Sequence, residues 1–156
     1  MVLAHLLAKG FHAAHTARNS PGFDILARKN DRYAAIRVKT ARGSDGAQWT
    51  AKRDGSLFLD FDPDDRTDFV VFVIGLTEIL ADVSFYIVPT TIVDSAMQDD
   101  IKLANVSRQA KGMVKLEDRE NKHRALWFNG SRDRPFYGYD KRWAKYRDAW
   151  HLLEGK

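Results

Sequence analysis

An aspartate, an arginine and a lysine lie in two short runs of strand-forming residues in the first third of the chain. Asp24 belongs to the run 22–28, and Arg37 and Lys39 belong to the run 33–41. The polar residues between the runs are typical of a tight hairpin turn. Such an acid and lysine suit phosphodiester chemistry, because a carboxylate can hold a divalent ion and an ammonium can steady the attacking water or the scissile phosphate.

The spacing of these residues predicts how they face one another. If the turn centres on Asn30 and Asp31, residues whose numbers sum to about 61 lie opposite each other across the two strands. Asp24 then faces Arg37, and Lys39 points to the same side of the sheet because strand side chains alternate. We therefore expect the three charged groups on one sheet face, at the open end of a hairpin.

The same residues resemble the PD-(D/E)XK nuclease superfamily, in which an acid ends one strand and the next strand carries an acidic-X-Lys pattern. Pro21-Gly22-Phe23-Asp24 matches the first part and Arg37-Val38-Lys39 the second. The resemblance is nearest to a bacterial restriction-endonuclease-like group whose second strand often contains Ile-Gln-Val-Lys-Thr. It implies catalytic roles for Asp24 and Lys39, with Asp24 as a ligand of Mg²⁺.

The resemblance also implies a fold class, and the pattern of elements agrees with it. We expect an α/β protein, a restriction-endonuclease-like mixed β-sheet flanked by helices with an αβββαβ-type core. The expected strands are 11–17, 22–28, 33–41, 68–76, 83–88 and 124–128, with 55–61 as an additional candidate. The expected helices are 2–7, 91–97 restarting at 101–106, and 140–153, and residues 42–54 are expected to form a polar connection.

The sequence departs from the family pattern at Arg37, which stands where an acid or glutamine is usual. A permanent positive charge opposite Asp24 is expected to form an ion pair with it and to repel a divalent cation. An Arg–Asp pair is also an ordinary cross-strand contact on a sheet surface. A glutamate near the first helix, common in the family, has no counterpart because the first acid is Asp24. Either the start has been lost or this copy does not need that glutamate.

Three functions stay open at this point. The first is a nuclease-like protein with a degraded metal site that binds nucleic acid, expected to be DNA. The second is an active Mg²⁺-dependent endonuclease that recruits another acid, so the chain's status as an enzyme is undecided. The third is a non-catalytic subunit that binds a partner protein, and a homodimer is a further alternative. Without activity, no cofactor is expected.

Composition limits the class of protein. The 156 residues are expected to form a single domain, 1–156, large enough to bury a core. The chain has no cysteine, which excludes disulfides and thiolate metal sites and fits a reducing cytoplasm. No apolar run approaches the roughly 20 residues that span a bilayer. We therefore expect a cytoplasmic protein without a membrane partner.

Charge is strongly segregated along the chain. Residues 1–53 carry ten Lys and Arg against three Asp and Glu, a net charge of +7. Residues 54–100 carry one arginine against eleven acids, a net charge of −10, and residues 101–156 return to +7. The basic thirds favour a phosphate-binding surface, unless the thirds neutralise each other in space. The acids of the middle third predict a solvated loop and are the nearest source of a replacement metal ligand: Asp60, Asp62, Asp64, Asp65 and Asp68.

Two further segments combine cations with aromatic residues. Arg42, Trp49, Lys52 and Arg53 follow the third expected strand and suit phosphate pairing and base stacking, although Trp49 is as readily explained as a core residue. The segment 127–139 interleaves aromatic residues with arginines. We interpret it as a turn-rich lid whose aromatic rings pack on the core, with a nucleic-acid-binding patch as the alternative.

Overall fold

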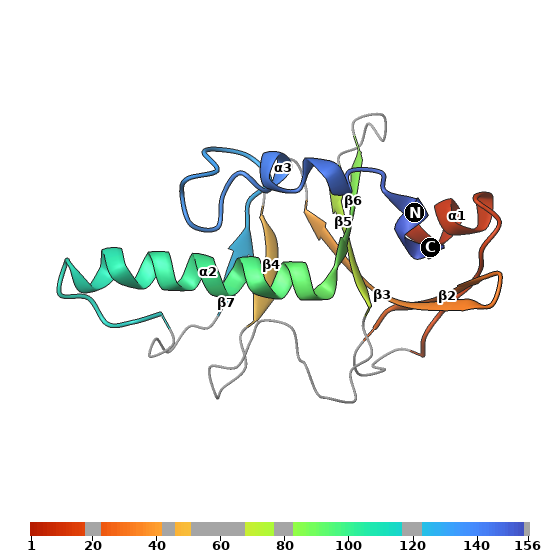
Figure 1. Ribbon diagram of the computed structural model, residues 1–156, viewed down its shortest axis with the longest axis horizontal. Coiled ribbons are helices and arrows are strands. Elements are labelled where there is room, and N and C mark those ends of the chain that lie inside the picture. Colours follow the sequence, from red (N-terminus) through yellow and green to blue (C-terminus); the bar gives the residue numbers. More distant parts are fainter. Residues whose placement is uncertain (18–22, 42–45, 51–67, 77–82, 117–122, 155–156) are drawn as a thin grey trace.

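The computed structural model describes residues 1–17, 23–41, 46–50, 68–76, 83–116 and 123–154 (Figure 1). Its strands are β1 His12–His15, β2 Ile25–Lys29, β3 Arg32–Ala41, β4 Ala47–Thr50, β5 Phe69–Ile74, β6 Ser84–Pro89 and β7 His123–Leu126. Its helices are α1 Val2–Ala8, α2 Thr90–Gln109 and α3 Tyr139–Arg142, followed by the 3₁₀ helices η2 Ala144–Tyr146 and η3 Trp150–Leu153.

Five strands form one mixed sheet in the order β1-β2-β3-β5-β6. β3 and β5 are parallel, whereas the other neighbouring pairs are antiparallel. The described elements begin with one helix and three consecutive strands, and helices pack on both faces of the mixed sheet, so the expected α/β class is confirmed. Helix α2 follows β6, so the described elements do not reproduce the expected αβββαβ order. The proposed extra strand 55–61 lies outside the described residues.

The hairpin of β2 and β3 has the register that the turn residues predict. Ile25 pairs with Ile36 and Lys29 pairs with Arg32, so two residues remain for the turn. Asn30, the first of these, has a φ of 53°, a left-handed conformation that asparagine tolerates better than most residues. The predicted hairpin is therefore confirmed.

The sheet is buried on both faces where β5 and β6 cross the middle of the molecule. Successive side chains of a strand point to opposite faces, so Val70 and Phe72 enter one core while Val71 and Val73 enter another. The first core includes residues of α2 and α3, and the second includes residues of α1 and η3. Figure 1 shows the same division, with α1 and the C-terminal segment beside the hairpin and α2 extending away from it.

The helix expected in two pieces, 91–97 and 101–106, is one continuous helix, α2. Asp99 and Asp100 lie in the gap between the two expected pieces. Asp99 is exposed, whereas Asp100 is 1% exposed and bonds to groups from the segment 127–142. The helix continues because those partners satisfy the buried carboxylate.

The expected C-terminal helix 140–153 is wrong. The chain forms short helical pieces instead, with Arg147 extended and Asp148 at a φ of 51° between η2 and η3. Asp148 donates its backbone N–H to the carbonyl of Phe85 in β6 at 2.8 Å. This hydrogen bond to the sheet replaces the one that a continuous helix would make. Helical spacing would place the large apolar residues of this segment on one face, but the structure divides them between the two cores: Trp143 and Tyr146 enter the first, Trp150 and Leu153 the second.

The expected polar connection 42–54 is also wrong in part, because residues 47–50 form β4. This strand pairs with β7 in a second, two-stranded sheet. Ala47 and Leu126, which face each other there, are both fully buried. The strand expected at 124–128 is confirmed as β7, and its pairing partner was not foreseen.

Candidate functional site

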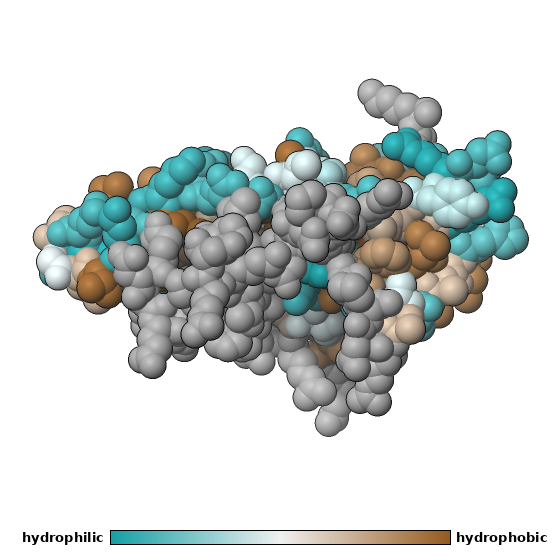
Figure 2. All heavy atoms as spheres, turned by 90° about the horizontal axis from the view of Figure 1, so that it is seen from below, coloured by the Kyte–Doolittle hydropathy of each residue, from teal (hydrophilic) through white to brown (hydrophobic). Residues whose placement is uncertain are grey.

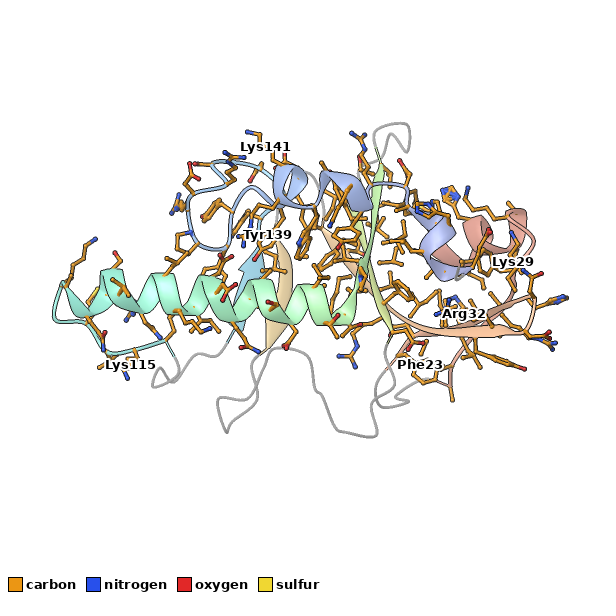
Figure 3. The ribbon with its side chains drawn as sticks, in the orientation of Figure 1. Phe23, Lys29, Arg32, Lys115, Tyr139 and Lys141 are labelled. Carbon is orange, nitrogen blue, oxygen red and sulfur yellow. The ribbon has the colours of Figure 1, made fainter. Side chains whose placement is uncertain are left out.

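Asp24 immediately precedes β2, at the open end of the hairpin. Its backbone N–H donates to the carbonyl of Ile36 at 2.8 Å, and its carbonyl accepts the N–H of Thr16 at 3.0 Å. The hydroxyl of Thr16 also donates to the carbonyl of Phe23 at 2.8 Å, and Figure 3 labels Phe23 at this end of the hairpin. The backbone around Asp24 is therefore fixed from both neighbouring strands.

The side chain of Asp24 is held by the main chain of β3. Oδ2 accepts the backbone N–H of Val38 at 2.6 Å. The carboxylate thus takes the place of a strand partner beyond the point where β2 ends. Oδ1 accepts no hydrogen bond from any residue that the structure describes, which leaves one carboxylate oxygen for other contacts.

Arg37 and Lys39 lie on the same side of the sheet. In the parallel pairing of β3 with β5, Arg37 is opposite Val70 and Lys39 is opposite Phe72, and both partners belong to the first core. Val38, between the two cations, packs against the second core instead. Both cations are half-buried at the border of the first core.

The charges of the three residues influence one another. Burial lowers the pKa of Lys39 from its usual 10.5, the neighbouring Arg37 lowers it further, and Asp24 acts in the opposite direction. The ammonium of Lys39 is thus partly desolvated and under the influence of both an acid and a second cation. Such a lysine gives up its proton more readily than an exposed one.

The contact made by Asp24 differs from the expectation in one respect. We expected its carboxylate to pair with the guanidinium of Arg37, but its hydrogen bond goes to the backbone of Val38. The physical reason is that the pairing of β3 with β2 ends at Ile36, so the N–H of Val38 has no partner in β2. Both cations consequently remain beside the acid without neutralising it through a direct hydrogen bond.

The described residues do not surround Asp24 with further metal ligands. No group of three or more acids or histidines lies together among the residues that the structure describes. Asp68, a proposed replacement ligand, binds the N–H of Ala35 through Oδ2 at 2.8 Å. Ala35 and Val38 are three positions apart, roughly 10 Å along the strand, so Asp68 is not beside Asp24. The other proposed loop acids fall outside the described residues: Asp60, Asp62, Asp64 and Asp65.

The nucleic-acid-binding residues proposed after β3 are placed only in part. Arg42, Lys52 and Arg53 lie outside the described residues. The backbone of Trp49 belongs to β4, where it pairs with Arg124 of β7, and its side chain is likewise not described. The structure therefore brings together Asp24, Arg37 and Lys39. Nucleic-acid binding by the four residues after β3 stays a prediction.

The segment 127–139 is a lid packed on the first core, as expected. Its ends are joined by a hydrogen bond from the N–H of Trp127 to the carbonyl of Phe136 at 2.8 Å. The rings of Phe128 and Tyr139 are buried. Gly138 has a φ of 68°, and a Cβ there would lie 2.6 Å from the backbone of Arg132, so only glycine fits.

Sequence reasoning missed the group that fastens this lid, Asp100 of α2. Its carboxylate accepts two hydrogen bonds from Arg142, at 2.8 and 2.9 Å, one from the hydroxyl of Tyr139 at 2.5 Å and one from the N–H of Phe136 at 2.8 Å. Helical spacing could have revealed it, because Val93, Met97 and Asp100 follow the buried stripe of α2.

No known protein-family model matches the chain, and no curated protein matches it. Among solved structures, the chain is similar to a bacterial homing endonuclease, with 17% sequence identity and a TM-score of 0.47 over 98% of this chain and 84% of the other. It is also similar to a Holliday junction resolvase from the archaeal hyperthermophile Archaeoglobus fulgidus, with 22% identity and a TM-score of 0.40 over 58% of this chain and 74% of the other.

Proposed function

We propose that this protein binds nucleic acid, with DNA as the expected ligand, through a PD-(D/E)XK-like site whose capacity to hold a metal is degraded. The observation that carries the proposal is the hydrogen bond from Val38 to Asp24. It keeps the acid beside Arg37 and Lys39 and engages one of its two oxygens. Among the residues that the structure describes, the site combines two cations with one carboxylate, a set that suits an anion better than a divalent cation.

The chemistry of the two cations supports a phosphate ligand. Arg37 carries a planar guanidinium that can donate two parallel hydrogen bonds to one phosphate. Lys39 adds a point charge two residues along the same face, in a partly buried position where its field is less screened by water. The basic first third of the chain, at a net charge of +7, would assist encounter with a polyanion.

The test is the binding of a fluorescently labelled DNA oligonucleotide in the absence of divalent ions, measured by anisotropy at several salt concentrations. The affinity should fall steeply as salt rises. Arg37→Gln should weaken binding and reduce the slope of log K against log[salt] by about 0.7–0.9, the contribution of one phosphate contact. Lys102→Gln is the matched control, because the side chain of Lys102 is 73% exposed on α2, outside the site. Absence of binding to any DNA or RNA would overturn the proposal and favour a protein-interaction subunit.

An active endonuclease is the second candidate. The second oxygen of Asp24 and the lowered pKa of Lys39 favour it. The additional acid that metal binding requires would come from outside the described residues. Incubation of plasmid with Mg²⁺ or Mn²⁺ tests this candidate: cleavage by the native protein that is lost in Asp24→Asn would establish it, and cleavage that persists in the variant would indicate contamination.

A further inference from the structure

The three-stranded part of the sheet, β1-β2-β3, has a face that carries aromatic and cationic side chains. Across these strands His12 pairs with Arg28, and Arg28 pairs with Tyr33, so the three side chains form one row on the same face. Tyr33 is 59% exposed, and His12 and Arg28 are exposed as well. This row lies at the turn end of the hairpin.

A second row on the same face is apolar. Ala14 pairs with Leu26, and Leu26 pairs with Ala35. Leu26 is 41% exposed, an unusual position for a large aliphatic side chain between two rows of charged residues. Five residues of the two rows line a groove of about 460 Å³: His12, Ala14, Leu26, Arg28 and Tyr33. Leu7 of α1 and the neighbouring Ala13 and Ala27 contribute as well. Figure 2 looks at the molecule from below, and apolar and hydrophilic surfaces alternate in its right-hand part.

The opposite face of the hairpin is already occupied. Ile25 and Ala27 enter the second core with α1. Lys29 points to the same side, where its ammonium donates to the carbonyl of Lys9 at 2.9 Å and pairs with Glu154 at 2.7 Å (Figure 3). The face with Tyr33 and Leu26 is therefore the one on which a ligand can be accommodated.

Arg28 and Tyr33 form an ordered pair. The guanidinium carbon of Arg28 lies 5.5 Å from the ring centroid of Tyr33. Arg28 donates through Nε to the carbonyl of Asn30 at 3.2 Å, and its Nη2 is 3.7 Å from the carboxylate of Asp31. Asp31 is fully exposed, so water screens this ion pair and a bound phosphate could displace it.

This face continues directly into the candidate site. Extension of the same register places Asp24 opposite Arg37 as the next row after Leu26 and Ala35. Rows on one face are two residues, or roughly 7 Å, apart along a strand. One surface therefore runs from Arg28 and Tyr33, across an apolar strip, to the cations that we propose bind phosphate.

We propose that this surface binds unpaired nucleotides next to the phosphate held at Arg37 and Lys39. A base stacks on the ring of Tyr33, Arg28 contacts a phosphate, and the apolar row around Leu26 contacts the sugar or base between them. Stacking on an aromatic side chain requires an uncovered base face, which single strands offer and duplex interiors do not. The inference rests on the proposed function and specifies its ligand as single-stranded or locally unpaired.

The test compares anisotropy titrations of a single-stranded oligonucleotide and a blunt duplex of the same sequence, without divalent ions. Tyr33→Leu should weaken single-strand binding about 10-fold or more, because stacking on one aromatic ring has an effect of that size. Tyr33→Phe keeps the ring and should keep the affinity. Arg28→Gln should weaken binding and reduce its salt dependence, whereas Lys102→Gln should change neither. Circular dichroism would establish that the variants are folded.

The outcomes separate this inference from the proposed function. Native protein that binds DNA, with Tyr33→Leu equally tight on single strands, overturns the inference and leaves the proposed function standing. A preference of the native protein for blunt duplex has the same consequence. Failure of the native protein to bind any nucleic acid overturns both. A change in oligomeric state with Tyr33→Leu in sedimentation would show that a second copy occupies the face, which also overturns the inference.

Discussion

The carboxylate of Asp24 accepts the backbone N–H of Val38 at 2.6 Å, so this acid is tied to the residue that separates Arg37 from Lys39. One contact thereby serves two purposes. It completes the hydrogen bonding of β3 beyond the end of β2, and it fixes a negative charge among two cations.

Replacement of Asp24 tests the structural purpose first. Asp24→Ala removes the acceptor for Val38 and should lower the free energy of unfolding by about 0.5–1.5 kcal/mol, the usual net contribution of one hydrogen bond. Asp24→Asn retains an acceptor oxygen and should lose less. Urea unfolding of the three proteins measures the difference, and equal losses for both variants would contradict a hydrogen-bonding role.

Arg37→Gln tests whether the arginine opposes metal binding. Removal of a permanent charge next to Asp24 should strengthen Mn²⁺ binding on the order of 10-fold, because like charges repel strongly near a partly desolvated site. Isothermal titration calorimetry measures the affinity. Arg28→Gln, the same substitution in another row of the same face, is the control. Unchanged Mn²⁺ binding in Arg37→Gln would count against the charge argument.

Lys39 should make stability depend on pH in the alkaline range. Its folded-state pKa is lowered below 10.5, mainly by burial and then by Arg37. The unfolded chain therefore holds this proton more tightly, and its protonation penalises the folded state at neutral pH. As pH rises toward 10.5 the penalty disappears, so the free energy of unfolding of the native protein should rise relative to Lys39→Met. Urea unfolding at pH 8 and pH 10 checks this, and parallel behaviour of the two proteins would contradict it.

Asp100 should be among the residues most important for stability. Its carboxylate is 1% exposed and accepts hydrogen bonds from Arg142, Tyr139 and Phe136. Asp100→Ala leaves the half-buried guanidinium of Arg142 and the buried hydroxyl of Tyr139 without their acceptor and should cost about 3–5 kcal/mol of unfolding free energy. Asp99→Asn is the control on the same helix, because Asp99 is 62% exposed. A loss below about 1 kcal/mol would mean that water replaces the carboxylate.

Tyr139 should make the protein less stable at high pH, whereas Lys39 should make it more stable. Burial raises the pKa of its hydroxyl above 10, and the hydrogen bond to Asp100 raises it further. The folded protein retains this proton above pH 10, whereas the unfolded chain releases it. Stability should therefore fall as pH rises beyond 10, and Tyr139→Phe should reduce that decline. Thermal unfolding at pH 9 and pH 11 provides the comparison, and equal declines would refute the assignment.

Local chemistry made the hairpin predictable. Asn30 and Asp31 favour a two-residue turn, and the turn fixes which residues of β2 and β3 face each other. Alternation along each strand then assigns Arg37 and Lys39 to one face without knowledge of the rest of the fold. The apolar run of β5 was recognisable from local sequence as well. A short, continuous run of β-branched and apolar residues is typical of a strand that is buried on both faces.

Competition between distant segments explains the errors. The spacing of Trp143, Tyr146 and Trp150 satisfies a helix, but the backbone of Asp148 bonds to Phe85 in β6 and divides the rings between two cores. Sequence spacing carries no information about that partner. In the same way, the residues between the two expected pieces of α2 include Asp100, whose partners in the segment 127–142 the sequence does not reveal.

The sequence by itself determined the hairpin, its register and the shared face of Asp24, Arg37 and Lys39, because turn chemistry and strand alternation act over a few residues. Only the tertiary structure decided that Asp24 bonds to the backbone of Val38 and that Asp100 holds the lid. It also decided that the face with Tyr33 is exposed. These features depend on which surfaces the distant elements cover, and that choice is made by packing of the whole chain.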